Sequence, residues 1–337
     1  MPYGENGRVR YAGGMAFSSL EEDIVRTVAY GQSVGFPLTS IGIAERIQHA
    51  QPIGEVVVTL ERLVGAGVLV SWSGRYGIGD RAKASIDEYE ARAALTRVRW
   101  LRALRRVRVL AWVPWVRAVW VSGSLAYDAS DADGDTDVVC LIAPGHLFSA
   151  RLCALALSSL FGIRRAAHEV RAPEKLCMNH WIADNGQQLV HRSIYTAWVY
   201  AHMIPVLGDP AARQWMGRQQ WMKEYLSYCA EASVQRTITT RALNTYWNAL
   251  WEFLLTLLEP FAKRVQVERI RRGIATVGQG RIQANDRVLE FHPRSQEPAV
   301  LATYQALCAS VGVGVSAPDS GLGVGVSDVL DIHSRLA

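Results

Sequence analysis

The sequence predicts an α+β protein built from three parts. Within the first 80 residues, three short helical patterns are followed by a strand, a turn and a second strand. In the middle of the chain, two apolar strand-like segments flank a small Gly-Ser turn and a run of acids. From Asp209 onward, aromatic residues and leucines recur at helical spacing, which predicts a C-terminal helical bundle. A chain of 337 residues, 50% of them hydrophobic and 20% charged, is long enough to fold as two or three domains.

The first part is expected to be a winged-helix domain over 16–80, preceded by a polar, Gly-rich and flexible N-terminus over 1–15. Ser18 followed by Glu21 is a capping-box signal that predicts the start of a helix. The helices are expected over about 18–30, 39–49 and 54–65, and the strand, turn and strand over 67–78. Three short helices closed by a hairpin are typical of a winged helix.

The third helix of a winged helix often binds DNA, but here its charge is unfavourable. It carries Arg62 as its one basic residue, against the acids Glu55 and Glu61. We therefore favour a structural or protein-contact role for this domain, with nucleic-acid binding as the alternative.

The second part, over 81–208, begins with a long basic helix expected over about 80–113. An apolar stripe is expected along this helix at Leu95, Val98, Leu101, Leu104 and Val107. Residues 91–127 contain no acid and carry Arg92, Arg97, Arg99, Arg102, Arg105, Arg106, Arg108 and Arg117. A solvated helix face is the favoured interpretation of these arginines, and a wall facing phosphate groups is the alternative. The whole chain has 36 basic and 31 acidic residues, a mild bias toward anionic partners.

The candidate catalytic residues lie where one predicted strand ends and the next begins. Asp135 and Asp137 are two apart on an apolar strand, so both carboxylates project from one face about 7 Å apart and can share Mg²⁺ or Mn²⁺ ions. Gly123 lets the backbone approach a ligand closely, and Ser122 and Ser124 offer hydroxyl and N–H groups to phosphate oxygens. This combination predicts metal-assisted phosphoryl or nucleotidyl transfer.

A Gly-Ser turn, a spacer of about ten residues and an Asp-x-Asp inside an apolar strand together resemble the signature of the DNA polymerase beta-like nucleotidyltransferase superfamily. Gly123, Ser124, Asp135 and Asp137 carry the resemblance, and a helix expected over 146–161 follows them. The chain is similar in particular to prokaryotic proteins, mostly uncharacterised, that fuse an N-terminal winged helix to such a domain. Further matching segments are VPWV at 113–116, APG at 143–145, LCMN at 176–179, YTA at 195–197 and FHP at 291–293.

The resemblance implies a reaction and roles for its residues. Asp135 and Asp137 would bind Mg²⁺ or Mn²⁺, and Gly123 and Ser124, with Ser122 beside them, would hold the phosphates of an NTP. A nucleoside monophosphate would pass from the NTP to an acceptor, with release of pyrophosphate. A small-molecule acceptor is preferred, while RNA and a protein side chain are further options. The alternative is a nucleic-acid-binding or nucleotide-sensing protein whose nucleotidyltransferase domain is inactive.

The sequence departs from the superfamily pattern at one position. Many members carry a third carboxylate on the strand after the helix. Here the middle of that strand, predicted over 175–183, holds Asn179, which can bind a metal weakly as a third ligand but cannot take a proton. Glu169, His180 or Asp184 could supply the missing base, the acceptor could need none, or catalysis could be lost; we favour retained activity. His180 follows Asn179 directly and is expected on the opposite face of the sheet.

The third part is expected to be a helical domain over 209–310 that closes one side of the cleft, followed by a flexible tail over 311–337. Its aromatic residues are expected to form a core, and its basic run over 264–272 to be a solvated helix face or to meet the triphosphate. The five cysteines are widely spread and never form a CxxC pair, which predicts neither a disulfide framework nor a zinc knuckle and favours the cytoplasm. We expect no membrane-spanning segment.

Overall fold

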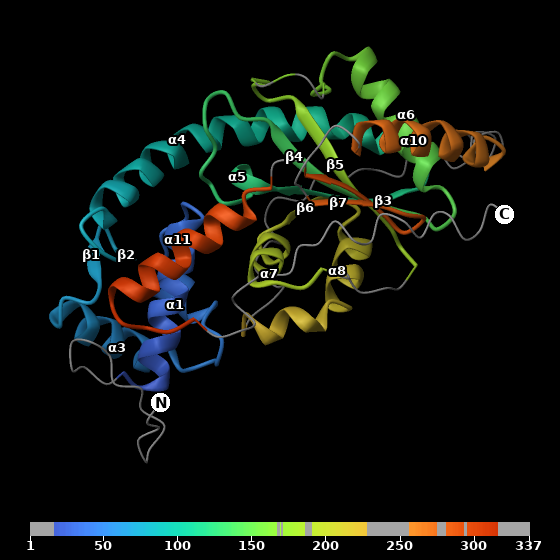
Figure 1. Cartoon of the computed structure of the whole chain (residues 1–337). Coiled ribbons are helices and arrows are strands. Elements are labelled where there is room, and N and C mark those ends of the chain that lie inside the picture. Colours follow the sequence, from blue (N-terminus) through green and yellow to red (C-terminus); the bar gives the residue numbers. More distant parts are fainter. Residues whose placement is uncertain are drawn as a thin grey trace.

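The computed structural model of the chain describes residues 17–166, 169, 171–185, 191–227, 256–274, 281–292 and 295–315. The α+β class is confirmed: a two-stranded sheet lies near the N-terminus, and a mixed six-stranded sheet has helices on both faces (Figure 1). The segment over 1–15, expected to be flexible, lies outside the described residues.

The N-terminal elements follow the predicted order of three helices and a hairpin. They are α1 (Ser19–Ser33), α2 (Ser40–Ala44), α3 (Ile53–Gly65), β1 (Val70–Trp72) and β2 (Arg75–Gly77). Helix α1 begins at the predicted capping box, in which the Ser18 hydroxyl accepts from the Glu21 N–H and the Glu21 carboxylate accepts from the Ser18 N–H. The expected second helix is shorter than predicted and ends at Ala44.

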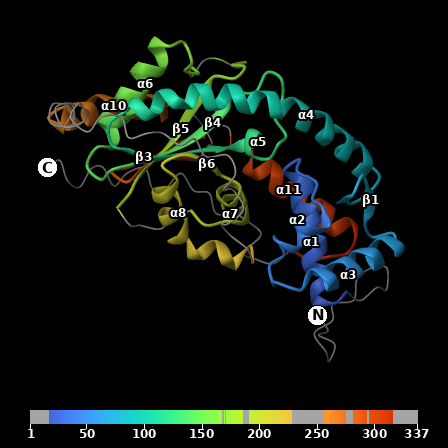
Figure 2. The ribbon, with the colours of Figure 1, turned by 180° about the vertical axis from the view of Figure 1, so that it is seen from behind.

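Helix α4 (Ala82–Val107) arches from the hairpin to the large sheet, as both views show (Figures 1 and 2), and continues as the short 3₁₀ helix η1 (Arg108–Trp112). The apolar stripe predicted for this helix is correct only at its C-terminal end, where Val107 is buried and Leu104 packs against the core. Leu95, Val98 and Leu101 are exposed, and the buried face is formed by Tyr89, Thr96, Arg99, Trp100, Ala103 and Val107. The helix packs against the sheet domain through Trp100 and the buried Arg99. The spacing of leucines in the sequence does not indicate this face.

The large sheet has the strand order β6-β3-β4-β5-β8-β7. Its strands are β3 (Val116–Ser122), β4 (Thr136–Ile142), β5 (Leu176–Ala183), β6 (Ile204–Leu207), β7 (Arg281–Ala284) and β8 (Val288–His292). Within the described residues, β4 and β5 are the parallel pair and the other neighbours run antiparallel. The parallel pair is joined by helix α6 (Leu147–Leu160), because parallel strands require a crossover connection.

Helices cover both faces of this sheet, and alternate residues of each strand enter two different cores. On one face, Val138 and Cys140 pack with α6, the end of α4 and α10 (Glu259–Ile274). On the other face, Val139 and Leu141 pack with α7 and α8. The elements of this second face are α7 (Ile194–Ala201), α8 (Asp209–Gly217) and the 3₁₀ helix η2 (Gln220–Glu224).

The core on the α7 side continues without interruption into the N-terminal domain. Helix α11 (Glu297–Ser310) lies against α1 (Figure 1), and its Tyr304 is fully buried beside Tyr30, which in turn contacts Trp198 of α7. The N-terminal helices, the sheet and the C-terminal helix therefore share one hydrophobic core.

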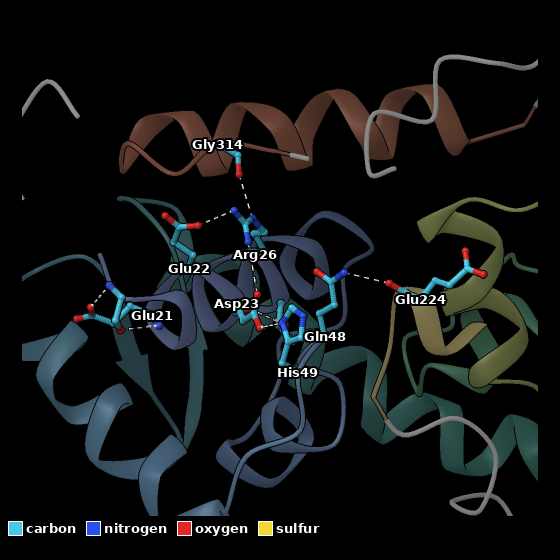
Figure 3. A network of polar contacts seen from close by, with 10 residues as sticks. Glu21, Glu22, Asp23, Arg26, Gln48, His49, Glu224 and Gly314 are labelled. Atoms are coloured by element: carbon cyan, nitrogen blue, oxygen red, sulfur yellow. Dashed lines mark hydrogen bonds and ion pairs between the residues drawn. The ribbon is translucent and has the colours of Figure 1, made fainter. Parts of the chain in front are cut away.

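A polar network reinforces this junction (Figure 3). Arg26 donates from Nε to the carbonyl of Gly314 at 3.0 Å, Gln48 donates to the carbonyl of Glu224 at 3.0 Å, and His49 contacts Asp23 at 2.7 Å. Residues 311–315, expected to belong to a flexible tail, are thus held against α1, and the buried Val313 packs in the shared core. The rest of the expected tail, over 316–337, lies outside the described residues.

The expectation of a purely helical C-terminal part is wrong over 281–292. There the chain forms the hairpin of β7 and β8, which extends the sheet beyond β5. Leu289 packs in the core while Glu290 faces the other side, an alternation typical of a strand. The aromatic residues expected as core are buried at Trp215 and Trp221, and those over 228–255 lie outside the described residues.

Candidate active site where β3, β4 and β5 meet

The Gly-Ser turn follows β3 directly and opens the one-turn helix α5 (Gly123–Ala126). Gly123 has a φ of +66°, a left-handed conformation that favours glycine. A Cβ atom at this position would lie 2.5 Å from Oδ2 of Asp137. Glycine is therefore required twice, by the backbone conformation and by the close approach of the Asp137 carboxylate.

The two predicted carboxylates are brought together at the start of β4. Asp137 is paired with Ser122 of β3 on one side and with Cys177 of β5 on the other. Burial, and then the negative charge of Asp135, raise the pKa of the Asp137 carboxyl to about 7. Keeping both carboxylates ionised therefore costs free energy, which a cation bound beside them would offset.

The two serines of the turn differ in their access to a ligand. Ser122 is 7% exposed, whereas the Ser124 side chain is exposed on α5. Ser124 also caps the turn through its carbonyl, which accepts from the Ala129 N–H at 2.9 Å. Ser124 is consequently the hydroxyl of this turn that a phosphate group could reach, while Ser122 mainly fixes the end of β3.

An arginine that the sequence analysis did not single out neutralises part of the pair. Arg165, in the segment between α6 and β5, forms a short ion pair with Asp135, and its Nη1 lies 3.7 Å from Sγ of Cys177. Its Nε donates to the carbonyl of Glu169 at 3.3 Å. The Glu169 carboxylate is paired with Lys175 and accepts from a backbone N–H at 2.9 Å. Glu169 therefore lies at the edge of the site, and its carboxylate is bound by Lys175 and a backbone N–H.

The position expected for a third carboxylate is occupied by Cys177. The register of β4 and β5 places Cys177 beside Asp137, and Asn179 donates from its amide to Sγ of Cys177 at 2.8 Å. Burial and the charges of the two aspartates raise the pKa of the Cys177 thiol well above its ordinary value. A neutral thiol with an amide beside it therefore lies where the resemblance leads one to expect a third carboxylate.

The expectation that His180 lies on the opposite face from the carboxylates is wrong. The β4–β5 ladder shifts by one residue, so that Cys177 pairs with Asp137 and His180, three residues later, pairs with Val139. Asp137 and Val139 are two apart and share a face, so His180 shares it as well. Its ring accordingly contacts Tyr200 of α7, on the same side of the sheet.

Asp184 lies at the opposite end of β5 from the pair, because β5 runs parallel to β4 and Asp184 follows its last residue. There the carboxylate is bound by Arg117 and Arg218, each at 2.7 Å. The hypothesis that Asp184 supplies a base or metal ligand is therefore wrong.

Three arginines of the basic helix hold the loops that border the site. Arg99 is buried and donates to the carbonyl of Gly134, and Arg102 and Arg106 both pair with Glu174. Nε and Nη1 of Arg99 have no hydrogen-bond partner among the described residues, and burial lowers its pKa. Arg99 therefore braces the acidic turn, and Arg102 and Arg106 hold the loop before β5. Arg97, Arg102, Arg105 and Arg108 are exposed, as expected of a solvated helix face.

The same sheet face holds Glu290, which the sequence analysis missed, and His292, which it noted only as part of the FHP segment. Glu290 and His292 of β8 lie next to His180, with Glu290 paired directly opposite it. The available signal was the alternation of Leu289 and Phe291 with Glu290 and His292, hidden within a region dominated by helical spacing.

No family model, curated protein or solved structure matches the chain. Among the helices that the structure describes, none is both long and apolar enough to cross a lipid bilayer.

Proposed function

We propose that the protein is a Mg²⁺-dependent nucleotidyltransferase that transfers a nucleoside monophosphate from an NTP to an acceptor hydroxyl. The observation that carries this proposal is the pair Asp135 and Asp137, packed directly against the Gly123 turn. Two carboxylates in such proximity favour a divalent cation, and oxygen donors are the ligands that Mg²⁺ prefers.

The residues present fit a Mg²⁺ ion held by these two carboxylates. Asp135, Asp137 and Cys177 place their donor atoms within 4.8 Å of one another, but a thiol is a poor ligand for a hard cation. Asp135 and Asp137 would therefore hold the ion. Bound there, Mg²⁺ would offset the charge of the triphosphate and polarise the phosphorus that is attacked.

The surrounding residues would bind and orient the nucleotide. The exposed Ser124 hydroxyl can donate to a phosphate oxygen beside the carboxylate pair. Arg165 contacts one oxygen of Asp135, and when this carboxylate binds a metal the guanidinium can turn to a phosphate oxygen. Positioning and charge neutralisation are the main contributions that phosphoryl-type transfer requires of a protein.

In the transfer step, the acceptor oxygen bonds to the α-phosphorus, the bond between the α-phosphorus and the bridging oxygen breaks, and pyrophosphate leaves. Neither Cys177 nor Asn179 can take the acceptor's proton, which then passes to solvent or to pyrophosphate. We therefore propose an acceptor that needs no strong base. A small molecule remains preferred over a nucleic acid, because the exposed residues of α3 include the acids Glu55 and Glu61 beside Arg62.

A second candidate is a nucleotide sensor that binds an NTP without turning it over. The observation that favours it is the neutral pair Cys177 and Asn179 where a carboxylate is expected, together with the ion pair between Arg165 and Asp135. A sensor could bind phosphates through Arg165 and Ser124 alone, so its affinity for nucleotide would not require Mg²⁺.

The test is calorimetric titration of ATP, CTP, GTP and UTP, with and without Mg²⁺, on the wild type and on the double variant Asp135→Asn/Asp137→Asn. Asp133→Asn is the matched control. This carboxylate belongs to the same acidic turn, but it is exposed and its ion pair with Arg171 is long, at 3.7 Å. We expect one NTP to bind only with Mg²⁺, and this binding to disappear in the double variant but not in the control.

Release of pyrophosphate from the bound NTP separates the two candidates, since a sensor releases none. Absence of binding for all four NTPs would contradict both. Equal binding with and without Mg²⁺ would contradict the transferase and support the sensor.

A further inference from the structure

A second cluster of metal-ligating side chains lies on the same sheet face as the carboxylate pair. It consists of His180 on β5 and Glu290 and His292 on β8, and we call it the His-Glu-His cluster. The donor atoms of the three side chains lie within 4.8 Å of one another. Nδ1 of His180 is 3.8 Å, and Nε2 of His292 is 3.5 Å, from the same carboxylate oxygen of Glu290.

Strand pairing and the alternation of side chains along β8 bring these three residues together. His180 and Glu290 are direct partners across the antiparallel β5–β8 ladder. Glu290 and His292 are two apart on one strand, so their side chains project from the same face. Leu289 and Phe291, which alternate with them, pack into the core on the opposite face. The three polar side chains are thus held together by backbone pairing and not by a flexible loop.

The spacing of the donor atoms suits a common metal ion better than direct hydrogen bonds. A nitrogen and an oxygen in a good hydrogen bond are about 2.7–3.2 Å apart, and both observed distances are longer. Ligands bound to one tetrahedral zinc ion at about 2.0–2.2 Å are separated from one another by about 3.3–3.6 Å. The cluster therefore needs only small side-chain movements to close on an ion.

A fourth residue orients the first histidine. The hydroxyl of Tyr200, a residue of α7, lies 3.1 Å from Nε2 and 3.4 Å from Nδ1 of His180. A histidine that binds a metal through one ring nitrogen commonly uses the other for such a contact. Nδ1 of His180, which lies 3.8 Å from the Glu290 carboxylate, is the ring nitrogen that would bind the ion. The side chains of His180 and Glu290 are 6% and 4% exposed, while that of His292 is 37% exposed and gives access from solvent.

We propose that His180, Glu290 and His292 bind a first-row transition-metal ion, Zn²⁺ being the best match, with solvent or a substrate atom as the fourth ligand. Two imidazoles and one carboxylate are donors that such ions prefer, whereas Mg²⁺ favours an all-oxygen site such as the one at Asp135 and Asp137. Three protein ligands with one open position are typical of a catalytic metal site and not of a structural one. The His-Glu-His cluster is separate from the proposed nucleotide site and does not depend on it.

The test is titration of the full chain, freed of metal by a chelator, with Zn²⁺ against a chromogenic competitor. We expect the wild type to bind one tight equivalent more than His292→Asn or Glu290→Gln. Cys177→Ser and Asp135→Asn/Asp137→Asn are matched controls that remove the neighbouring cluster, and both should keep this equivalent. Tyr200→Phe should weaken it about 10- to 100-fold, because it removes only the contact that orients His180.

Co²⁺ provides a second readout, since its visible absorption reports the ligands that surround it. The wild type should bind Co²⁺ with the intense bands of a low-coordinate site, and His292→Asn should lose them. Because the His292 side chain is partly exposed, this variant is expected to fold even if Glu290→Gln does not. Equal Zn²⁺ stoichiometry in the wild type and in His292→Asn, or loss of the tight equivalent in Cys177→Ser, would overturn the proposal.

Discussion

Gly123 is the most constrained residue of the candidate site, and its two constraints are separable. Its φ of +66° is costly for any residue with a side chain, and its neighbour Asp137 leaves no room for a Cβ atom. Gly145 has a similar φ of +81°, but no atom lies within 4 Å of a Cβ placed there. The two glycines therefore form a natural pair for measuring the steric contribution alone.

We predict that Gly123→Ala lowers the free energy of unfolding by more than Gly145→Ala. The backbone conformation should cost about 1–3 kcal/mol at either position, and the contact with the Asp137 carboxylate should add to it only at Gly123. Chemical denaturation of both variants measures the difference. Equal losses of stability would show that the turn can move away from Asp137, which contradicts the close packing of the site.

Arg165 leads to a second prediction at the scale of single residues. Because its guanidinium pairs with Asp135, it competes with any metal for that carboxylate. Arg165→Gln should therefore tighten binding of Mn²⁺ measured without nucleotide, by up to about fivefold, since partly exposed ion pairs contribute up to about 1 kcal/mol.

The matched control is Arg164→Gln, because this neighbouring side chain bonds Ser159 instead of the carboxylate pair. Weaker Mn²⁺ binding in Arg165→Gln than in this control would mean that Arg165 supports the metal site and does not compete for it.

At the scale of elements, α7 is tied to the N-terminal domain through the histidine that ends it. His202 donates from Nδ1 to the carbonyl of Trp198 at 2.7 Å and accepts at Nε2 from Arg46 at 2.9 Å. Burial, and then the positive charge of Arg46, lower the pKa of His202 from 6.5 to about 3. The histidine is thus neutral in the folded protein at every pH at which the protein would be studied.

This arrangement predicts a pH dependence of stability. Between pH 6.5 and 3 the unfolded chain binds a proton at His202 that the folded chain does not, so stability falls as the pH falls. From pH 7 to pH 5 this group alone should remove about 2 kcal/mol of unfolding free energy. Urea denaturation at both pH values should show a smaller loss for His202→Gln than for the wild type. Parallel losses in the two proteins would show that His202 is not buried as a neutral group.

The sequence allowed good predictions where a signal is local. The capping box of Ser18 and Glu21, the hairpin after α3 and the two strands around the Gly-Ser turn were all expected, because caps, turns and apolar runs depend on neighbouring residues. The proximity of the Asp135 and Asp137 carboxylates was likewise expected from their spacing.

Features that depend on pairing between distant segments were not predictable. The register shift in β5 places Cys177, and not Asn179, beside Asp137. The same shift places His180 on the sheet face that holds Asp137. No local pattern encodes such a shift, because it depends on how β5 fits β4. The addition of β8 to the same sheet, which brings in Glu290, depends equally on long-range pairing.

At the scale of the whole molecule, the predicted domains share one core. Tyr304 of α11 is fully buried between α1 and the rest of the protein, although about 270 residues separate it from the Tyr30 ring that it contacts. The N-terminal helices are therefore packed as part of the body, and we expect them not to unfold as a separate unit.

This architecture predicts one cooperative unfolding transition that Tyr304→Ala shifts as a whole. Removing a fully buried aromatic ring should cost about 3–5 kcal/mol. Scanning calorimetry, combined with near-ultraviolet dichroism, can follow the N-terminal domain and the sheet together. Two separate transitions, of which Tyr304→Ala shifts one alone, would contradict the shared core. Leu160→Ala, at a side chain that is 79% exposed, is the control expected to have little effect.

The central claim is that Asp135 and Asp137 bind the metal that holds an NTP against the Gly123 turn. A crystal structure with Mn²⁺ and a non-hydrolysable analogue of the NTP that binds tests it most directly, because Mn²⁺ is located by its anomalous scattering. We predict Mn²⁺ between the two carboxylates, phosphate oxygens beside Ser124, and the Arg165 guanidinium moved away from Asp135. A nucleotide bound elsewhere, with Arg165 still paired to Asp135 and no metal between the carboxylates, would contradict the claim.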